Sequence, residues 1–290
     1  MRIVDAYQAG RFGLSFELFP PKNAATEATM WQTVKELVFF QPSFVTCTYG
    51  AGGSTRATTL DVIEGVRSRH NLPVASHLTC VGSSVDELRS YLREAEARGV
   101  AAIVALRGDP PKGEAEFRPV DGGLRHASEL VSLIRAEFPS FDIIVAGYPE
   151  THQEAISPAD DLLNLKRKCD AGGEVVVTQL FYDNADFFRF RDECNRIGID
   201  APLVPGVMPV THYAQIRRIA SLCKARLPER LTQAFEAAGD DESAQFEVGV
   251  DFATRQVQEL LDGGVPGIHF YVLNRSPATV RVLQQVAIAR

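Results

Sequence analysis

The chain has 290 residues, with 30 basic and 37 acidic side chains and a formal net charge of −7. Apolar residues make up 45% and charged residues 23%, which is typical of a soluble globular protein and excludes a disordered, collagen-like or disulfide-rich chain. The negative charge also argues against nucleic acid or an anionic membrane as the partner, because both require clustered cations.

The length permits two ordinary domains or one α/β barrel, since such barrels reach about 250 residues or more as a single unit. The five cysteines are scattered and none belongs to a CxxC pair, which indicates reduced thiols rather than disulfides or a zinc site. The first residues lack the long apolar run of a signal peptide, and no apolar stretch reaches the roughly 20 residues of a membrane helix. We therefore expect a soluble, cytoplasmic protein.

Short β-rich runs alternate along the chain with longer amphipathic runs. The predicted strands are rich in Val, Ile, Phe and Thr and are bounded by Gly, Pro or Asp. They cover 14–19, 43–49, 74–80, 101–106, 142–147, 174–181, 203–208 and 267–272. Several are apolar almost throughout, which favours a parallel sheet that is covered on both faces.

Helical patterns separate these strands. A helix over 86–98 places its apolar residues on one face and ends before Gly99. Helices over 157–171 and 276–287 both begin with Ser-Pro, a favoured cap followed by a favoured first residue. The first four strands begin 29, 31 and 27 residues apart, which corresponds to one βα unit per interval.

Eight strands in alternation with helices favour a (β/α)8 TIM barrel over a doubly wound sheet. The last interval is the longest, and it contains helical patterns over 213–223 and 246–262 on either side of an acidic break at 239–242. No linker rich in Pro or Ser separates this segment from the rest. We predict a single barrel domain over 1–290, with an extra helical segment between strands 7 and 8.

In such a barrel the functional residues lie at the carboxyl ends of the strands and in the loops that follow. Glu17 stands in the otherwise apolar first strand, with Phe16 and Phe19 nearby. A carboxyl group that is desolvated in this way has a raised pKa, as a general acid working near neutral pH requires. A core glutamate paired with a Lys or Arg is an equally good interpretation.

Polar residues also mark the next three strands. Thr48 precedes the glycine-rich stretch 50–55, whose backbone amides could approach a ligand, although a loop before a helix cap is the simpler interpretation. His77 in the third strand is either a hydrogen-bonded core residue or a ligand contact. Arg107 and Asp109 flank Gly108 at the end of the fourth strand, which favours a preorganised polar site over a structural ion pair.

Further candidates follow the fifth, sixth and eighth strands. Asp161, Asn164 and Lys168 share one helix face, and 166–168 is a dense basic run that could hold a pyrophosphate or simply be solvated. Aromatic, amide and charged groups after the sixth and eighth strands suit recognition of a flat heterocycle. These groups are Gln179, Tyr182, Asp183, Tyr271, Asn274 and Arg275. No cluster has the pattern of a metal site or of a Ser-His-Asp or Cys-His arrangement.

Eight motifs occur in order from the first predicted strand to the last. They are FELFPPK, VTCTYGAGGSTR, SHLTC, ALRGDPP, AGYPETH, DLLNLKRKCDAG, VTQLFYD and HFYVLNR. With these residues, spread over almost the entire chain, the sequence resembles the methylenetetrahydrofolate reductase family. The resemblance is to the bacterial form that consists of the catalytic domain alone.

The resemblance implies a barrel that binds FAD non-covalently, takes a hydride from NADH or NADPH, and reduces 5,10-methylenetetrahydrofolate to 5-methyltetrahydrofolate by a ping-pong mechanism. Glu17 would be the general acid that helps to open the five-membered ring of the folate. Asp109 would lie between flavin and folate. Gln179, Tyr271 and Arg275 would bind the folate, and the protein would form a homo-oligomer, as the family does.

The family's FAD contacts carry over onto a larger set of residues, at strand ends and on two helices. This set comprises Thr48, His77, Leu106, Arg107, Gly108, Asp109, His126, Ala127, Ala146, Tyr148, His152, Asp161, Asn164, Arg167 and Lys168. One of them departs from the family's pattern, because His126 stands where many bacterial relatives have Tyr, and the charge of a His can vary with pH. We expect Arg107, Arg275 and the basic run 166–168 to gather at the barrel mouth.

Two other classes of protein stay open on the sequence. One is a flavin-binding barrel that oxidises an amino acid such as proline, and the other is a non-catalytic module that binds folate or flavin. Bleaching of the flavin by different substrates separates the two enzymes.

Overall fold

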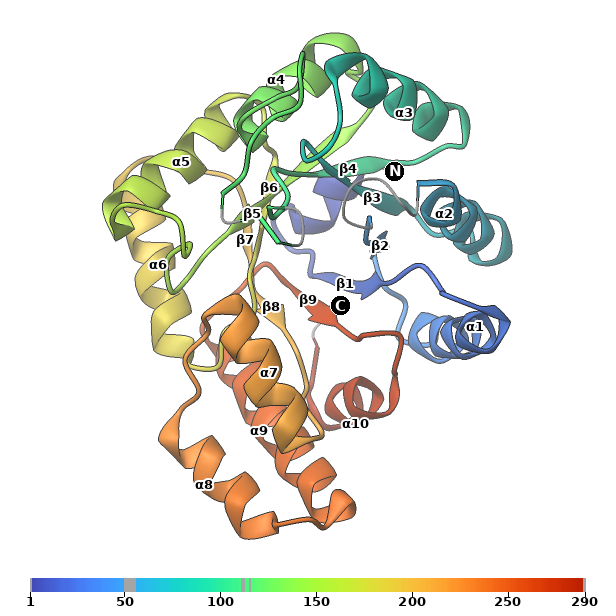
Figure 1. The fold of residues 1–290 in the computed structure, drawn as a ribbon. Coiled ribbons are helices and arrows are strands. Elements are labelled where there is room, and N and C mark those ends of the chain that lie inside the picture. The colour runs from blue at the N-terminus through green and yellow to red at the C-terminus, as the bar shows by residue number, and fades with distance from the viewer. Residues whose placement is uncertain (1, 50–55, 111–112, 115, 289–290) are drawn as a thin grey trace.

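The computed structural model describes residues 2–49, 56–110, 113–114 and 116–288, whose strands form a parallel barrel surrounded by helices (Figure 1). The sheet has the strand order β7-β6-β5-β4-β3-β2-β1-β9-β8. The strands are β1 (Gly13–Leu18), β2 (Phe44–Cys47), β3 (Val74–Thr79), β4 (Ala102–Leu106), β5 (Asp142–Gly147), β6 (Val175–Thr178), β7 (Leu203–Val204), β8 (Gly206–Val207) and β9 (Gly267–Tyr271). The predicted (β/α)8 architecture is confirmed.

The barrel closes through a strand that is broken in the middle. The predicted strand 203–208 is in fact two short pieces, β7 paired with β6 and β8 paired with β9, and Pro205 lies between them. Proline has no N–H for the ladder, which interrupts the strand. The carbonyl of Pro205 still accepts a hydrogen bond from the His269 N–H at 3.0 Å, so the ring of backbone pairing continues across the break.

The helices that surround the barrel mostly follow the predicted βα alternation. Their bounds are η1 (Ile3–Tyr7), α1 (Ala24–Val38), α2 (Arg56–His70), α3 (Val85–Ala97), α4 (Ala127–Glu137), α5 (Pro158–Asp170), α6 (Asn184–Arg196), α7 (Tyr213–Cys223), α8 (Glu229–Ala238), α9 (Glu242–Asp262) and α10 (Pro277–Gln285). Ser157 caps α5 as predicted, because its hydroxyl accepts a hydrogen bond from the Asp160 N–H at 3.2 Å. Ser276 does not cap α10 in this way, since its side chain bonds to Glu36 instead.

The segment between the seventh and eighth barrel strands contains α7, α8 and α9, which lie together on one side of the barrel (Figure 1). The extra helical material was predicted, but α8 was not, and α9 begins at Glu242 rather than at 246. The acidic break is shorter than predicted because Asp241 caps α9, accepting hydrogen bonds from the N–H groups of Ser243 and Ala244.

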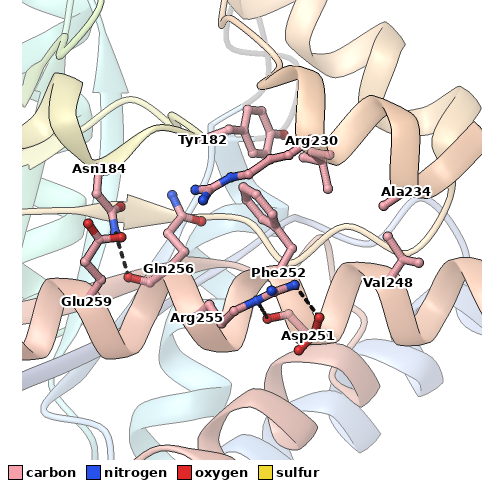
Figure 2. Close-up of a pocket in the computed structure, with 11 residues that line it drawn as sticks. Tyr182, Asn184, Arg230, Ala234, Val248, Asp251, Phe252, Arg255, Gln256 and Glu259 are labelled. Carbon is pink, nitrogen blue, oxygen red and sulfur yellow. Dashed lines mark hydrogen bonds and ion pairs between the residues drawn. The ribbon is translucent and has the colours of Figure 1, made fainter.

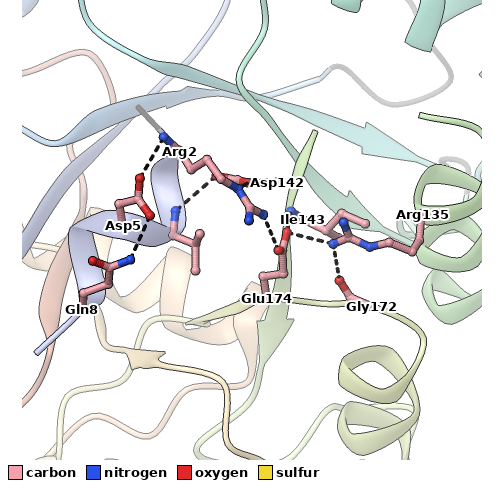
Figure 3. A network of polar contacts seen from close by, with 9 residues as sticks. Arg2, Asp5, Gln8, Arg135, Asp142, Ile143, Gly172 and Glu174 are labelled. Carbon is pink, nitrogen blue, oxygen red and sulfur yellow. Dashed lines mark hydrogen bonds and ion pairs between the residues drawn. The ribbon is translucent and has the colours of Figure 1, made fainter. Parts of the chain in front are cut away.

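The interior of the barrel is apolar at its amino end. Small and branched side chains from several strands pack there against Ile3, Ala6 and Tyr7 of η1. Arg2 fastens η1 to the barrel through Asp142 at 2.7 Å and Glu174 at 2.5 Å, as Figure 3 shows. The amino end is therefore filled, and the opposite end of the barrel is where a ligand can enter.

Candidate functional site

A cavity of about 560 Å³ lies at the carboxyl ends of the strands. We call it the main cavity. The predicted residues that line it come from seven strands or the loops after them, and they are Glu17, Thr48, His77, Leu106, Arg107, Gly108, Asp109, Ala146, Tyr148, His152, Gln179 and Tyr271. The position agrees with the rule that TIM barrels place their sites at this face.

A second hollow of about 300 Å³, the side cavity, adjoins the main cavity. Both are lined by Leu106, Arg107, Ala146, Tyr148 and His152, so the two spaces share one wall. The predicted residues found only in the side cavity are His126, Ala127, Asp161, Asn164, Arg167 and Lys168. The two cavities therefore adjoin at this end of the barrel, and the basic residues Arg167 and Lys168 lie in the side cavity alone.

Glu17 lies at the bottom of the main cavity with only 7% of its surface exposed. Burial raises the pKa of Glu17 to about 8, as its apolar strand predicted. The nearest basic group is His77, whose Nε2 lies 3.4 Å from the Glu17 carboxyl, and burial lowers the pKa of His77 to about 4. At neutral pH both groups are therefore mainly uncharged, and Glu17 carries a proton.

The alternative interpretation of Glu17, a core glutamate paired with a Lys or Arg, does not hold. Within the described ranges no Lys or Arg side chain forms an ion pair with it. The one ionisable group that pairs with it among the described residues is His77, which is largely shielded from solvent and mainly uncharged at neutral pH. A protonated carboxyl group in an apolar setting is suited to donating a proton.

Several polar residues beside Glu17 were not singled out from the sequence. Ser15 and His269 line up across the β1–β9 pair, and the Ser15 hydroxyl lies 2.8 Å from Nδ1 of His269. Burial, with a smaller contribution from His77, lowers the pKa of His269 to about 3. The hydroxyls of Thr46 and Thr79 are buried and have no hydrogen-bond partner in the part of the chain that the structure describes.

Strand alternation could have identified these residues. Side chains on one face of a strand recur every second residue, so an inward Tyr271 implies an inward His269, and an inward Glu17 implies an inward Ser15. Ser15 is opposite His269 and Glu17 is opposite Tyr271, so the four side chains form two successive polar levels of the barrel.

The loop after β4 is shaped by Gly108. Its φ of +88° is left-handed, and a Cβ there would lie 2.6 Å from Cγ1 of Val81. The neighbouring Arg107 binds both carboxyl oxygens of Glu154, at 2.6 and 2.8 Å. Arg107 does form an ion pair, but with Glu154 rather than with Asp109, and Asp109 faces the main cavity.

The side cavity contains a partly buried lysine. Lys168 donates a hydrogen bond from Nζ to the carbonyl of Ala146 at 2.5 Å, and burial lowers the pKa of Lys168 to about 8. Asp161 accepts a hydrogen bond from the His152 N–H at 2.8 Å, which fixes the loop after β5. Arg167 is held by Asn164 at 2.6 Å. The polar stripe predicted on this helix therefore faces a cavity rather than solvent.

Some predicted residues lie elsewhere. Lys166 does not line either cavity and pairs with Asp170 at 2.7 Å, and Arg275 is exposed outside both. Asp183 caps α6, while Asn274 holds the backbone of Phe19 with two hydrogen bonds. The glycine-rich stretch 50–55 lies outside the described residues.

Within the described residues, no group of three or more His, Cys, Asp or Glu side chains could hold a metal ion. No described helix is long and apolar enough to cross a membrane.

Tyr271 donates a hydrogen bond from its hydroxyl to the carbonyl of Thr178 at 2.6 Å, and Gln179 follows Thr178 in the chain and lines the main cavity. The arrangement suits a flat organic molecule that needs a proton donor and an adjoining pocket for charged groups.

Comparison with known proteins gives a family match and close relatives. The family model described as methylenetetrahydrofolate reductase matches residues 2–287. The 5,10-methylenetetrahydrofolate reductase of Escherichia coli strain K12 is 39% identical over 279 residues, covering 96% of this chain and 92% of that protein. Methylenetetrahydrofolate reductase (NADH) 1 of Zea mays is 36% identical over 297 residues, covering 99% of this chain and 50% of that protein.

A solved structure supports the fold. An uncharacterized protein from Clostridium thermocellum, described as binding two copies of 5-methyl-5,6,7,8-tetrahydrofolic acid, superimposes with a TM-score of 0.65. The match covers 98% of this chain and 97% of that protein at 12% identity. At this identity the likeness concerns the barrel architecture alone.

Proposed function

The chain belongs to the methylenetetrahydrofolate reductase family, and from this premise we propose that it reduces 5,10-methylenetetrahydrofolate to 5-methyltetrahydrofolate, with FAD as its cofactor and NADH or NADPH as hydride donor. The family makes the protein an oxidoreductase. The observation that carries the proposal is Glu17, a buried carboxyl group that keeps its proton at neutral pH inside the main cavity. The name of the maize relative favours NADH as the donor.

The residues present fit FAD. The main cavity has largely apolar walls with the unpartnered hydroxyls of Thr46 and Thr79, which suits a flat ring that carries acceptors. The side cavity offers Arg167 and Lys168, which suit a pyrophosphate. Gly108 keeps the loop after β4 close to its neighbours. FAD, when bound, would supply the two-electron carrier between nucleotide and folate.

Glu17 acts in the proposal as a general acid. Its proton goes to a nitrogen of the folate's five-membered ring, whose bond to the bridging carbon then breaks, with the electron pair staying on that nitrogen and an iminium remaining. Because the pKa of Glu17 is about 8, the acid form dominates at neutral pH without being too weak an acid. Burial is the cause of this raised pKa, and His77 and Tyr271 lie beside the carboxyl group.

The other residues bind and orient. We assign Asp109, which lines the main cavity, to contact with cofactor and folate, where a carboxylate would favour release of a hydride from the cofactor to the folate. Gln179 and Tyr271 are assigned to the folate, and both line the main cavity. Arg275 is assigned to the outer part of the folate, since it is exposed outside the cavity. His126 lines the side cavity in place of the family's Tyr.

Product analysis tests the proposed function. FAD-loaded protein is incubated with 5,10-methylenetetrahydrofolate and either NADH or NADPH, and the folates are separated by chromatography. The proposal predicts 5-methyltetrahydrofolate that requires protein, FAD and nucleotide. Protein that retains FAD but forms no such product with either nucleotide would refute it.

A further inference from the structure

A cavity of about 370 Å³ lies outside the barrel, between the start of α6 and the facing sides of α8 and α9 (Figure 2). We call it the α8–α9 cavity. Among the described residues, none lines both this cavity and the main cavity. Its volume falls within the range of about 300–1,000 Å³ that is usual for small-molecule sites.

The side-chain amide of Asn184 lies at one end of the α8–α9 cavity, and its oxygen Oδ1 is buried without a hydrogen-bond donor among the described residues. Asn184 is 4% exposed, and its Nδ2 donates to the carbonyl of Gln256 at 3.0 Å and to Glu259 at 2.9 Å. These bonds fix the amide plane, so that Oδ1 faces away from them and has no donor in the part of the chain that the structure describes. Buried acceptors are almost always hydrogen-bonded, so the site favours a ligand that brings an N–H group.

Two arginines and two carboxylates line the cavity, and Arg230 and Glu259 are the two that form no ion pair among the described residues. Asp251 and Arg255 form an ion pair with each other. Arg230 forms no ion pair with any described residue, and its guanidinium lies 5.5 Å from the ring centre of Phe252, over the cavity (Figure 2). A carboxylate can therefore bind Arg230, whereas a phosphate dianion would also face the carboxylates of Asp251 and Glu259.

The other end of the cavity is apolar. Leu231, Ala234, Val248 and Phe252 line it, and Figure 2 shows Ala234 and Val248 on the side away from Asn184. A ligand that matches the whole cavity carries an anionic group, a cationic N–H donor and an apolar body. An amino acid with an apolar side chain has these three groups on one carbon atom.

We propose that the α8–α9 cavity is a binding site for an apolar α-amino acid. The carboxylate binds Arg230, the ammonium group donates to Oδ1 of Asn184 and to Glu259, and the side chain packs against Leu231, Val248 and Phe252. The proposal is independent of the reductase activity, because it concerns a separate cavity and is tested by binding.

The site is in contact with the walls of the main cavity. Tyr182 and Leu231 line the α8–α9 cavity and belong to one apolar cluster with Leu180 and Met208, which line the main cavity. This packing places the α8–α9 cavity next to one wall of the main cavity.

Isothermal titration calorimetry on the FAD-loaded protein tests the proposal with L-leucine, L-methionine and L-phenylalanine as probes. Two analogues of leucine test the anchors separately: 4-methylpentanoate lacks the ammonium group, and 3-methylbutylamine lacks the carboxylate. We expect at least one amino acid to bind, and we expect the analogues to bind roughly tenfold more weakly or worse, as expected when a charged hydrogen bond is lost.

Two variants and a control locate the binding. Arg230→Ala and Glu259→Gln should each lower the affinity for the amino acid by roughly tenfold or more, because each removes one charged group that binds it. Arg217→Ala is the matched control: Arg217 is also exposed and lies over an aromatic ring, that of Tyr213 at 5.7 Å, but it is outside the cavity. Glu259→Gln retains an acceptor for the hydrogen bond from Asn184 and should therefore fold. Its affinity for the amino acid tests the proposal if Arg230→Ala fails to fold.

Two results would overturn the proposal. One is that none of the three amino acids binds the wild-type protein. The other is that an amino acid binds with the same affinity to wild type and to the folded anchor variants, which would place it elsewhere, for instance in the main cavity.

Discussion

Replacing Glu17 by Gln tests the role of the buried carboxyl group most specifically. Gln has nearly the same shape as a protonated Glu but cannot give up a proton, so binding is kept while acid catalysis is lost. General acid catalysis contributes roughly 10²–10⁴-fold in rate. We predict that oxidation of NADH in the FAD-loaded variant stays within a few-fold of wild type, while folate reduction falls by about that factor. Stopped-flow measurement of the two half-reactions separates them.

The same substitution has a second consequence, for stability. The folded-state pKa of Glu17 is about 8, above its ordinary value of 4.5, so folding favours the protonated form. As pH rises from 5 to 8 the unfolded chain releases this proton first, and the wild type loses stability. For these two pKa values the loss amounts to roughly 3–4 kcal/mol.

The Gln variant lacks this titration, so its stability relative to wild type should rise by that amount between pH 5 and pH 8. Urea unfolding of both proteins at the two pH values measures the difference. A stability difference that is the same at both pH values would show that folding does not raise the pKa of Glu17. Folate turnover that survives in the variant would show that Glu17 is not the acid.

Other changes test the rest of the site and the fold. Lys168→Met should weaken FAD binding by roughly ten- to a hundredfold in a fluorescence titration, because it removes a partly buried cation from the side cavity, whereas Lys166→Met, outside both cavities, should leave it unchanged. Gly108→Ala should lower the free energy of unfolding by roughly 2–4 kcal/mol, against about 1–2 kcal/mol for Gly122→Ala, which also has a positive φ but has nothing within 4 Å of its added Cβ. Equal losses would show that the contact with Val81 is not tight. Asp142→Asn should cost about 1 kcal/mol in thermal or urea unfolding by weakening the hold on Arg2, and should leave turnover unchanged because it lies at the opposite end of the barrel.

Most of the barrel could be predicted from the sequence, because the strands are short, apolar and regularly spaced. Two elements differ from the prediction, the seventh strand and helix α8, and each differs for its own reason. Pro205 divides the seventh strand, although all residues around it are typical of a strand. Helix α8 has only two deeply buried apolar residues, Leu231 and Phe235, and such a sparse pattern does not distinguish a helix from a loop.

The candidate site was predicted where a polar residue interrupts an apolar strand, as Glu17 does. His269 interrupts β9 in the same way but was not predicted, because a lone histidine in an apolar strand is as typical of a hydrogen-bonded core residue as of a binding site. Ionic partners could not be predicted from local patterns. Glu154 binds Arg107 from 47 residues away, through a contact between two loops. The α8–α9 cavity likewise arises from tertiary packing of helices and has no sequence motif.

The visible absorption spectrum of the purified protein is the decisive test of flavin-dependent folate reduction. We expect the absorbance of an oxidised flavin, which NADH or NADPH bleaches under anaerobic conditions and which 5,10-methylenetetrahydrofolate restores. The Glu17→Gln variant should bleach normally but fail to recover at a comparable rate. A colourless protein that gains no activity with added FAD, or a bleached protein that the folate does not reoxidise, would contradict flavin-dependent folate reduction.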